Sequence, residues 1–573
     1  MIDAERILQE TYPDFKFGKD NKLVVQALKK LIHEDDFNDV IRKNQHLRGF
    51  AFLDKLLNYF KFNYQVSNDC YNNIPSEGRL LIVANHPIGT LDGLALVKLI
   101  RSVRPDVRIV ANRVLSHMEP LQSIFLPVDV LSDKKKLKDV YKVMLDALEN
   151  EEAIIFFPAG EVSRITPKGI RDGAWQSGFI KLARRAQCPI LPIFIKAKNS
   201  ALFYSASTLY KPLGTMLLVK EMFNKKGQEI KFMVGAPVPY QVIADSEESN
   251  KQLSQRFRKH VQNLGKKNKP ALFETVATVV HPSDTKAVKK ALYQSRLLGE
   301  TRDGKKIFLY QFQDDCPVMR EIARLRELTF RTVEEGTGLA LDLDKFDIYY
   351  SHIVLWDDND LEIVGAYRVG DGPAIMASHG IDGFYTQTLF DLRNEFEAYL
   401  PHSIELGRSF VQPRYWGQHS LDYLWYGIGA YLRERPDIKY LFGPVSISNA
   451  YPQAAKELII GFYQQQFASD LQNTKARTPF VMSQQCKAFA ATEFSADYST
   501  SFKILNSELK KLGVKVPTLY KQYVELCVDK GCHFVAFNID PDFNNCIDGL
   551  IMVEVDKIAP KKRQRYIEKS LAG

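Results

Sequence analysis

The stretch Asn85-His86-Pro87-Ile88-Gly89-Thr90-Leu91-Asp92-Gly93 lies between two strongly apolar runs, residues 80–84 and 94–100. The first run contains no polar residue and predicts a buried strand, so the polar stretch falls at a strand-to-helix turn. An α/β fold carries its chemistry at turns of this kind. A neutral histidine held by a carboxylate can take a proton from a hydroxyl, which makes His86 and Asp92 candidate catalytic residues. A Gly/Pro turn with an incidental histidine is the alternative for this stretch alone.

Three further blocks in the same part of the chain combine a strand-like apolar run with characteristic residues. They are Asn112-Arg113 after residues 109–111, Pro158-Ala159-Gly160-Glu161 with Ser163 and Arg164 after residues 153–157, and the Pro-containing run 189–195. Together with the first stretch, and in this order, these blocks resemble the glycerolipid acyltransferase family of the phosphatidic-acid-forming type. The resemblance covers roughly residues 71–270.

Two details depart from the pattern of that family. Five residues separate His86 from Asp92 where the family has four, and the third block has Pro-Ala-Gly-Glu in place of Pro-Glu-Gly. Both variants look like those of a subset that handles amino-acid-containing lipids. Gly89 can absorb the additional residue in a local bulge, because glycine adopts unusual dihedral angles. If the turn contains no such bulge, Asp92 lies out of reach of His86.

The resemblance implies direct transfer of an acyl group from a thioester to a hydroxyl, with no Ser or Cys nucleophile. His86 would deprotonate the acceptor hydroxyl, and Asp92 would fix its tautomer and stabilise the imidazolium. Arginine binds carboxylate or phosphate with two parallel hydrogen bonds, which suits the polar head of an acceptor. The implied substrate-binding residues are Asn112, Arg113, Gly160, Glu161, Ser163 and Arg164. A solvated surface charge is the alternative for each arginine alone.

The second half of the chain contains the block Ser403-Ile404-Glu405-Leu406-Gly407-Arg408-Ser409-Phe410-Val411. A turn with Arg414 and Gly417 follows, then an apolar helix over 421–432 and a strand over 440–447. This order resembles the GNAT acyltransferase family, whose corresponding turn offers backbone N–H groups to the phosphates of the donor. Arg414-x-x-Gly417 is a partial match to that turn.

Three features make the second resemblance closer, and it spans roughly residues 305–500. They are Glu405-Leu406-Gly407-Arg408, the run Glu334-Glu335-Gly336-Thr337 with Asp342, Asp344 and Asp347, and Gly365-Ala366-Tyr367-Arg368. Their order is similar to the GNAT branch that contains the acyl-homoserine-lactone synthases and the ornithine N-acyltransferases. The resemblance implies transfer of an acyl chain to the α-amine of an amino acid. In this transfer Glu405 would accept the proton of the ammonium group, and Arg368 and Arg408 would bind a carboxylate or a carrier phosphate. A structural ion pair between Glu405 and Arg408 is the alternative.

The whole chain resembles the bifunctional ornithine lipid synthase family. That resemblance implies N-acylation of ornithine with a 3-hydroxyacyl chain from acyl carrier protein, followed by O-acylation of the resulting lyso-ornithine lipid. It also implies acyl carrier protein or coenzyme A as the donor, and no metal or other cofactor for either step. One alternative is an acyltransferase with a different acceptor, lysophosphatidate or the lipid of another amino acid such as glycine or lysine. The other is a non-enzymatic, haemolysin-like membrane protein.

The predicted fold class is α/β, with a glycerolipid-acyltransferase domain followed by a GNAT-like domain similar to the acyl-homoserine-lactone synthases. The expected divisions are a helical cap, 1–70; the O-acyltransferase domain, 71–270; a helical connector, 271–300; and the N-acyltransferase domain with a C-terminal extension, 301–573. Residues 46–64 show an amphipathic helical pattern. Such a helix either lies on a bilayer or packs its apolar face on the core.

Composition narrows the partners and the compartment. The chain has 573 residues, too many for one core, and a formal net charge of +9. Membrane lipid and an acidic carrier protein suit this charge, whereas no nucleic-acid-binding motif is present. Seven cysteines without a Cys-x-x-Cys pair favour a reducing compartment and no metal site. With no signal pattern and no apolar run of about 18–20 residues, we expect a cytoplasmic protein at the inner face of the cytoplasmic membrane.

Overall fold

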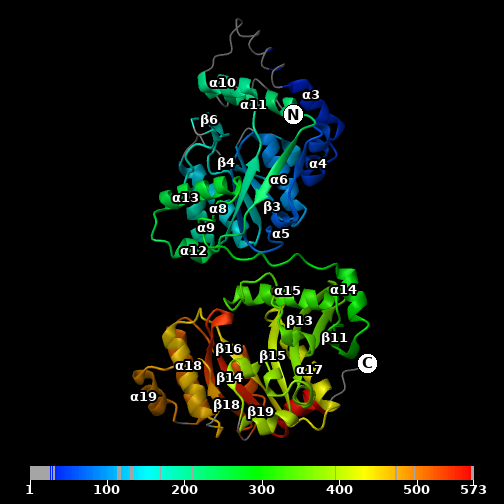
Figure 1. The fold of residues 1–573 in the computed structure, drawn as a ribbon, viewed down its shortest axis with the longest axis vertical. Helices are drawn as coiled ribbons and strands as arrows, with labels where there is room; N and C mark the ends of the chain where they lie inside the picture. The colour runs from blue at the N-terminus through cyan, green and yellow to red at the C-terminus, as the bar shows by residue number, and fades with distance from the viewer. Residues whose placement is uncertain are drawn as a thin grey trace. The chain divides into compact units, whose positions relative to one another are not determined.

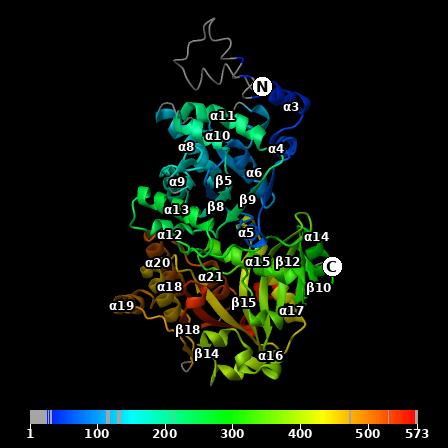
Figure 2. The ribbon, with the colours of Figure 1, turned by 45° about the horizontal axis from the view of Figure 1, so that its top comes forward.

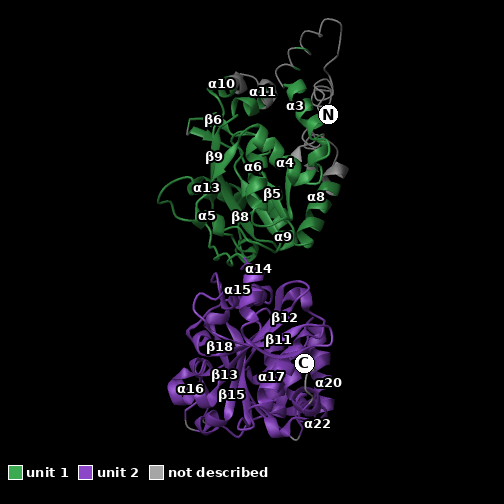
Figure 3. Ribbon diagram, turned by 90° about the vertical axis from the view of Figure 1, so that its right-hand side faces the viewer, with its two compact units in different colours: residues 1–281 green, residues 282–573 purple. Residues whose placement is uncertain are grey.

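The computed structural model describes residues 26, 29, 33–112, 118–128, 134–167, 169–209, 211–393, 395–471, 474–495, 497–528 and 530–568. The chain forms two compact units, residues 1–281 and residues 282–573 (Figure 3). Each unit contains its own central sheet with helices around it (Figure 1). We call them the first unit and the second unit.

The first unit is built on a mostly parallel sheet of seven strands in its described part. Their order is β1 (Asn63–Gln65), β9 (Glu229–Val234), β8 (Ile190–Lys196), β2 (Leu80–Ala84), β5 (Ala153–Phe156), β3 (Val107–Asn112) and β4 (Phe125–Val128). The pairing of β8 with β9 is antiparallel and the other pairings are parallel. Every residue of β2 is buried, as its unbroken apolar run predicts for a central parallel strand.

Helices cover both faces of this sheet (Figures 1 and 2). The side chains of β2 alternate between two cores, because successive residues of a strand point to opposite faces. On one face lie α4 (Gly49–Tyr59) and α6 (Thr90–Arg101); on the other lie α8 (Lys134–Glu149), α9 (Gly178–Ala186) and α13 (Asn250–Leu264). The remaining elements are α3 (Glu34–Lys43), α5 (Asn68–Asn72), α10 (Ala201–Leu209), α11 (Lys211–Asn224), α12 (Tyr240–Ala244) and the hairpin β6 (Arg164–Thr166) and β7 (Gly169–Arg171).

Within the amphipathic segment 46–64, residues Gly49–Tyr59 form α4, and its apolar face packs on the core. Leu53, Leu57 and Phe60 are fully or almost fully buried. These side chains stabilise the first unit, and Leu47 and Phe50 of the same stripe are partly buried against its core. The membrane-contacting role of this segment stays a prediction. Among the residues that the structure describes, no helix has the length and apolar character needed to cross a bilayer.

The second unit contains an eight-stranded sheet in its described part. The order is β10 (Arg296–Glu300), β11 (Lys306–Gln311), β12 (Ser351–Asp357), β13 (Glu362–Asp371), β15 (Ser403–Val411), β16 (Tyr440–Ile447), β19 (Cys546–Glu554) and β18 (Cys532–Asp540). All neighbours are antiparallel except β15 and β16. That parallel pairing covers only Ser403–Glu405 against Tyr440–Phe442, and the two strands then diverge.

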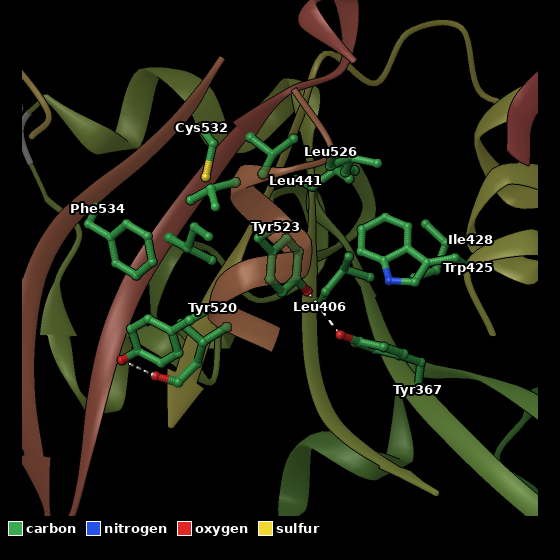
Figure 4. Close-up of a cluster of buried hydrophobic side chains, with 14 of the residues drawn as sticks. Tyr367, Leu406, Trp425, Ile428, Leu441, Tyr520, Tyr523, Leu526, Cys532 and Phe534 are labelled. Carbon is green, nitrogen blue, oxygen red and sulfur yellow. Dashed lines mark hydrogen bonds between the residues drawn. The ribbon is translucent and has the colours of Figure 1, made fainter. Parts of the chain in front are cut away.

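Helices also cover both faces of the second sheet. One face carries α14 (Thr285–Leu292) and α15 (Pro317–Thr332), and the other carries α17 (Ser420–Arg433), α18 (Gln453–Gln466), α20 (Tyr498–Lys511) and α21 (Thr518–Val524). The remaining elements are α16 (Gly372–Ser378), α19 (Gln484–Glu493), α22 (Pro560–Arg563), β14 (Phe390–Asp391) and β17 (Lys475–Ala476). Figure 4 shows how Tyr367, Trp425 and Tyr523 pack in the larger core, with 3.0 Å between the hydroxyls of Tyr367 and Tyr523.

The segment between the two predicted domains differs from a helical connector. Residues 271–300 are helical only over α14, and Arg296–Glu300 form β10, the edge strand that pairs with β11. The irregular part, residues 271–284, precedes α14, whose N-cap Asp284 accepts a hydrogen bond from the Ala287 amide. The second sheet thus begins earlier in the chain than the apolar pattern alone indicates.

Candidate active sites

His86 and Asp92 lie together at the carboxyl end of β2 and the start of α6. His86 Nδ1 is 3.0 Å from Asp92 Oδ1. Both atoms are buried, and neither has another hydrogen-bonding partner among the described residues. The His86 side chain keeps 20% of its surface exposed while that of Asp92 has none. The imidazole is therefore reachable, and the carboxylate can act only through it.

The additional residue between His86 and Asp92 is absorbed at Gly89, as a local bulge requires. Gly89 has a φ of 103°, a conformation that favours glycine, and it caps α6. Asp92 Oδ2 accepts hydrogen bonds from the amides of Ile88 (2.9 Å) and Gly89 (3.3 Å). One carboxylate oxygen thus fixes the turn while the other faces the histidine.

The charge around His86 favours its protonated form. Burial alone lowers the pKa of His86, but the carboxylates of Asp92 and Asp172 outweigh it and raise the pKa above 6.5. The ring also stacks on Phe157, with 4.1 Å between the ring centroids. The same carboxylates stabilise the imidazolium that forms when the histidine takes a proton from a hydroxyl.

Asp172 organises this site, and the sequence patterns did not single it out. Its Oδ1 accepts hydrogen bonds from the His86 amide (3.2 Å) and Ser163 Oγ (2.5 Å), and its Oδ2 accepts one from Trp175 Nε1 (2.9 Å). Ser163 closes the ring by donating its amide to the His86 carbonyl at 2.7 Å. These contacts give Ser163, which was predicted to bind substrate, a structural role in joining two sequence blocks.

Arg164 has groups left to bind an anion. Its Nη2 lies 3.4 Å from Glu161 Oε2, while Nε and Nη1 are buried and have no hydrogen-bonding partner among the described residues. Gly160 forms the preceding turn with a φ of 67°. Asn112 ends β3, and the prediction for Arg113 lies outside the described residues.

Replacing Asp92 with Asn tests the pairing through the pH dependence of O-acylation. A neutral imidazole is required, so activity falls as pH drops through the pKa of His86. Removing the Asp92 charge lowers that pKa, so we expect the acidic limb to move to lower pH while kcat falls about 10²–10⁴-fold. The control is Asp54→Asn, which removes a surface carboxylate beside Lys98 and Arg101. An unchanged acidic limb in Asp92→Asn would contradict the pairing.

The second unit has a cavity of about 90 Å³ where β15 and β16 diverge. Its lining includes residues 406–409 of β15 and residues 444–446 of β16. The charged side chains that line it are Arg408, Glu335 and Asp548. Gly443 permits the close approach at the fork, because a Cβ there would lie 2.0 Å from the Leu406 carbonyl oxygen. The cavity is thus an opening within the sheet, between two of its strands.

Arg408 is the predicted residue that faces this cavity. Its backbone has a φ of 45°, an uncommon conformation for a non-glycine residue, beside a bulge in the pairing of β13 with β15. The guanidinium lies over the ring of Tyr385, and Nη1 donates to the Tyr385 hydroxyl at 3.1 Å. Asp342 Oδ2 is 3.4 Å from Nε. The cation is therefore held in place and stays protonated.

Asp548 and Glu335 are the acids of the cavity, and neither was among the predicted site residues. Asp548 Oδ1 accepts a hydrogen bond from Ser446 Oγ at 2.6 Å, across the pairing of β16 with β19. Burial raises the pKa of Asp548 to about 6. Burial and the charge of Asp548 raise the pKa of Glu335 to about 8. Two carboxyls with separated pKa values beside an arginine are suited to proton transfer.

Glu405 occupies a different environment from the one predicted for an amine-binding base. Its carboxylate is buried and accepts hydrogen bonds from the Tyr350 hydroxyl, the amides of Tyr385 (3.2 Å) and Thr386 (2.7 Å), and Thr386 Oγ1 (2.6 Å). Glu405 does not line the described cavity. With its oxygens bonded in this way, the carboxylate fixes the loop that carries Tyr385, which in turn holds Arg408. The role of Glu405 as a base stays a prediction.

Arg368 and Arg414 are also bound by carboxylates of the chain. Arg368 is 1% exposed, and its Nη1 lies 2.7 Å from Asp344 Oδ1 and 3.2 Å from Asp347 Oδ1. Arg414 is paired at the surface with Asp360 (3.0 Å) and Glu362 (2.6 Å). Gly417 has a φ of 76° in the turn before α17. These three residues do not line the cavity with Arg408.

Comparisons with known proteins agree with the two folds. Residues 6–267 match the family described as acyltransferase, and residues 325–426 match the acetyltransferase (GNAT) domain. Glycine N(alpha)-acyltransferase of Bacteroides thetaiotaomicron is 30% identical over 303 residues, which cover 51% of this chain and 89% of that protein. Lyso-glycine lipid O-acyltransferase of the same organism is 29% identical over 254 residues, covering 43% of this chain and 91% of that protein.

A third relative carries a different amino acid in its name. L-ornithine N(alpha)-acyltransferase of Brucella abortus is 32% identical over 148 residues, covering 23% of this chain and 51% of that protein. The chain is an acyltransferase that combines an acyltransferase domain with a C-terminal GNAT domain. It belongs to the family of the bacterial glycine N(alpha)-acyltransferases.

Proposed function

We propose that the chain makes a diacylated amino-acid lipid in two consecutive steps. The second unit joins a 3-hydroxyacyl chain to the α-amine of an amino acid, and the first unit esterifies the 3-hydroxyl of the product. The observation that carries this proposal is that one chain matches both an N-acyltransferase and an O-acyltransferase over about nine-tenths of their lengths. The product of the first reaction contains the hydroxyl that the second reaction requires.

At the first site, His86 takes the proton from the acceptor hydroxyl as its oxygen attacks the thioester carbonyl. Asp92 stabilises the imidazolium, which then returns the proton to the leaving thiolate. The unpaired N–H groups of Arg164 bind an anionic group of one substrate, since guanidinium pairs well with carboxylate and phosphate. Phe157 stacks on the imidazole and limits its rotation.

At the second site, the charged groups of the cavity match the main-chain atoms of a zwitterionic amino acid. Arg408 binds its carboxylate, and Asp548 accepts the proton that the α-ammonium must lose before the amine can attack. The diverging strands β15 and β16 leave an opening for the donor. An extended, amide-containing arm such as that of acyl carrier protein or coenzyme A can pair with such strand edges. A basic chain of net charge +9 suits an acidic carrier protein as the donor.

Glycine is the acceptor that we favour over ornithine. The relatives named for glycine are 30% and 29% identical to this chain and are matched over 89% and 91% of their lengths. A relative named for ornithine that is matched over 92% of its length is 26% identical. Ornithine is the second candidate, because the paired acids Asp548 and Glu335 would also receive an additional ammonium group, and relatives named for ornithine are matched.

The purified full chain, assayed with 3-hydroxyacyl carrier protein and single amino acids, tests this proposal. We expect N-acylation of glycine with a kcat/KM at least about tenfold above those of ornithine and lysine. The same assay with 3-hydroxyacyl coenzyme A compares the two donors. Preference for ornithine would replace glycine as the acceptor, and the absence of any amide product would refute N-acylation by this chain.

A further inference from the structure

The first unit contains an open cavity of about 1060 Å³ beside the turn that carries His86. Ile88, two residues after His86, lines it, and so do the exposed side chains of Ile165 and Ile170 from the β6–β7 hairpin. Asn199, after β8, also lines it and donates from Nδ2 to the Pro87 carbonyl at 3.3 Å. The cavity therefore joins an apolar wall to the backbone of the catalytic turn.

Asn199 presents a hydrogen-bond acceptor that the chain leaves unused. The residue is 4% exposed, and its Oδ1 is buried with no hydrogen-bonding partner among the described residues. A buried polar atom without a partner costs roughly 1–3 kcal/mol, so such an atom at a cavity indicates a ligand that donates to it. The N–H group of an amide is one such donor.

Two lysines, Lys225 and Lys198, line the same cavity. Lys225 is 9% exposed and Lys198 is exposed; both line the cavity, and no ion pair of either appears within the described residues. Burial lowers the pKa of Lys225, and the nearby Lys198 lowers it further, while Glu221 opposes this effect. A buried ammonium beside a second cation gains most from an anionic ligand.

The carboxylates nearest to these lysines are occupied elsewhere. Glu221 accepts hydrogen bonds from the Ser200 amide (2.8 Å), Ser200 Oγ (2.6 Å) and Asn224 Nδ2 (3.1 Å). Glu229 lines the cavity at its exposed side and accepts one from Gln65 Nε2 at 2.6 Å. Both carboxylates are thus hydrogen-bonded to other groups, although the charge of Glu221 still acts on the Lys225 ammonium.

We propose that this cavity binds the acceptor of the O-acylation, an N-(3-hydroxyacyl) amino acid, through its amide and its free carboxylate. The amide N–H donates to Asn199 Oδ1, and the carboxylate lies on Lys225 and Lys198. Because only a few bonds separate the 3-hydroxyl from the amide, this placement directs the hydroxyl toward the turn of His86. The assignment rests on the proposed function and adds the residues that select the acceptor.

The test compares a free acid with its neutral ester in the full chain. The transfer of an acyl chain to N-(3-hydroxyacyl)glycine, and to its methyl ester, is measured for four proteins. They are wild type, Lys225→Met, Lys198→Met and the matched control Lys226→Met. Lys226, the next residue in the chain, is exposed, lies over the Tyr59 ring and does not line the cavity. Thermal unfolding of each variant establishes that it is folded.

In wild type we expect a KM for the ester about 10–100-fold above that for the acid. Lys225→Met raises the KM for the acid by the same factor and leaves the ester and kcat unchanged; Lys198→Met has a smaller effect in the same direction, and Lys226→Met has none. Equal use of acid and ester by wild type overturns the inference even if Lys225→Met fails to fold. Transfer to lysophosphatidate that is sensitive to Lys225→Met, with no preference for the acid, assigns the lysines to a phosphate and also overturns it. Wild type that acylates neither hydroxyacyl compound refutes the proposed O-acylation itself.

Discussion

Replacing His86 with Ala is expected to lower the rate of O-acylation by about 10²–10⁴-fold, because the hydroxyl then has no base within reach. His86 is the imidazole that combines 20% exposure with a buried carboxylate at 3.0 Å, and its raised pKa depends on that carboxylate. The measurement is single-turnover transfer of a labelled acyl chain from its carrier to a synthetic N-(3-hydroxyacyl) amino acid. In cells the same variant should accumulate the monoacylated lipid.

The specificity of this effect is checked in the same preparation. N-acylation by His86→Ala should equal that of wild type, because the second unit has its own core and its own cavity. His33→Ala is a matched control, since His33 pairs with Asp36 at the surface. O-acylation that survives His86→Ala at the wild-type rate would exclude His86 as the base.

Replacing Asp548 with Asn is expected to have the second large effect, a fall of about 10²–10⁴-fold in N-acylation. The amide keeps the shape of the side chain and can still accept from Ser446, but it cannot take a proton from the ammonium. In wild type the carboxylate must be ionised, so the rate should rise as pH passes about 6, the raised pKa of Asp548. In the variant this limb should disappear.

Asp540→Asn provides the matched control for this measurement. Asp540 is also buried and accepts from the Tyr385 hydroxyl at 3.3 Å, but it does not line the described cavity. Its replacement should keep the limb but move it to lower pH, because the charge of Asp540 contributes to the raised pKa of Asp548. A limb that persists in Asp548→Asn and vanishes in Glu405→Gln would return the role of base to Glu405.

Much of the fold follows from local apolar patterns. The runs 80–84 and 440–447 form β2 and β16 with the bounds that their patterns predict. Strands with neighbours on both sides must be apolar throughout, and amphipathic helices repeat at 3.6 residues, so both are visible in one sequence. The pattern over 46–64 predicted the helix but left open what covers its apolar face, because a core and a bilayer select the same side chains.

The sites were predictable where the chemistry is local and not where it depends on tertiary contacts. His86 and Asp92 are six positions apart, and the conformation of Gly89 joins them. Asp548 comes from β19, far in the chain from Arg408, and only the divergence of β15 and β16 exposes both to one cavity. Glu405 stands in a block that indicates chemistry, but Tyr350 and Thr386 reach its oxygens from distant segments.

The most direct measurement is the lipid composition of a bacterium that makes no aminolipids, after expression of this chain. By mass spectrometry, cells with the wild-type chain should contain a diacylated amino-acid lipid. Cells with His86→Ala should contain only its monoacylated form, and cells with Asp548→Asn should contain neither. The mass of the head group identifies glycine or ornithine. No new aminolipid from wild type, with a changed phosphatidate pool instead, would contradict the two-step proposal and indicate a lysophosphatidate acceptor.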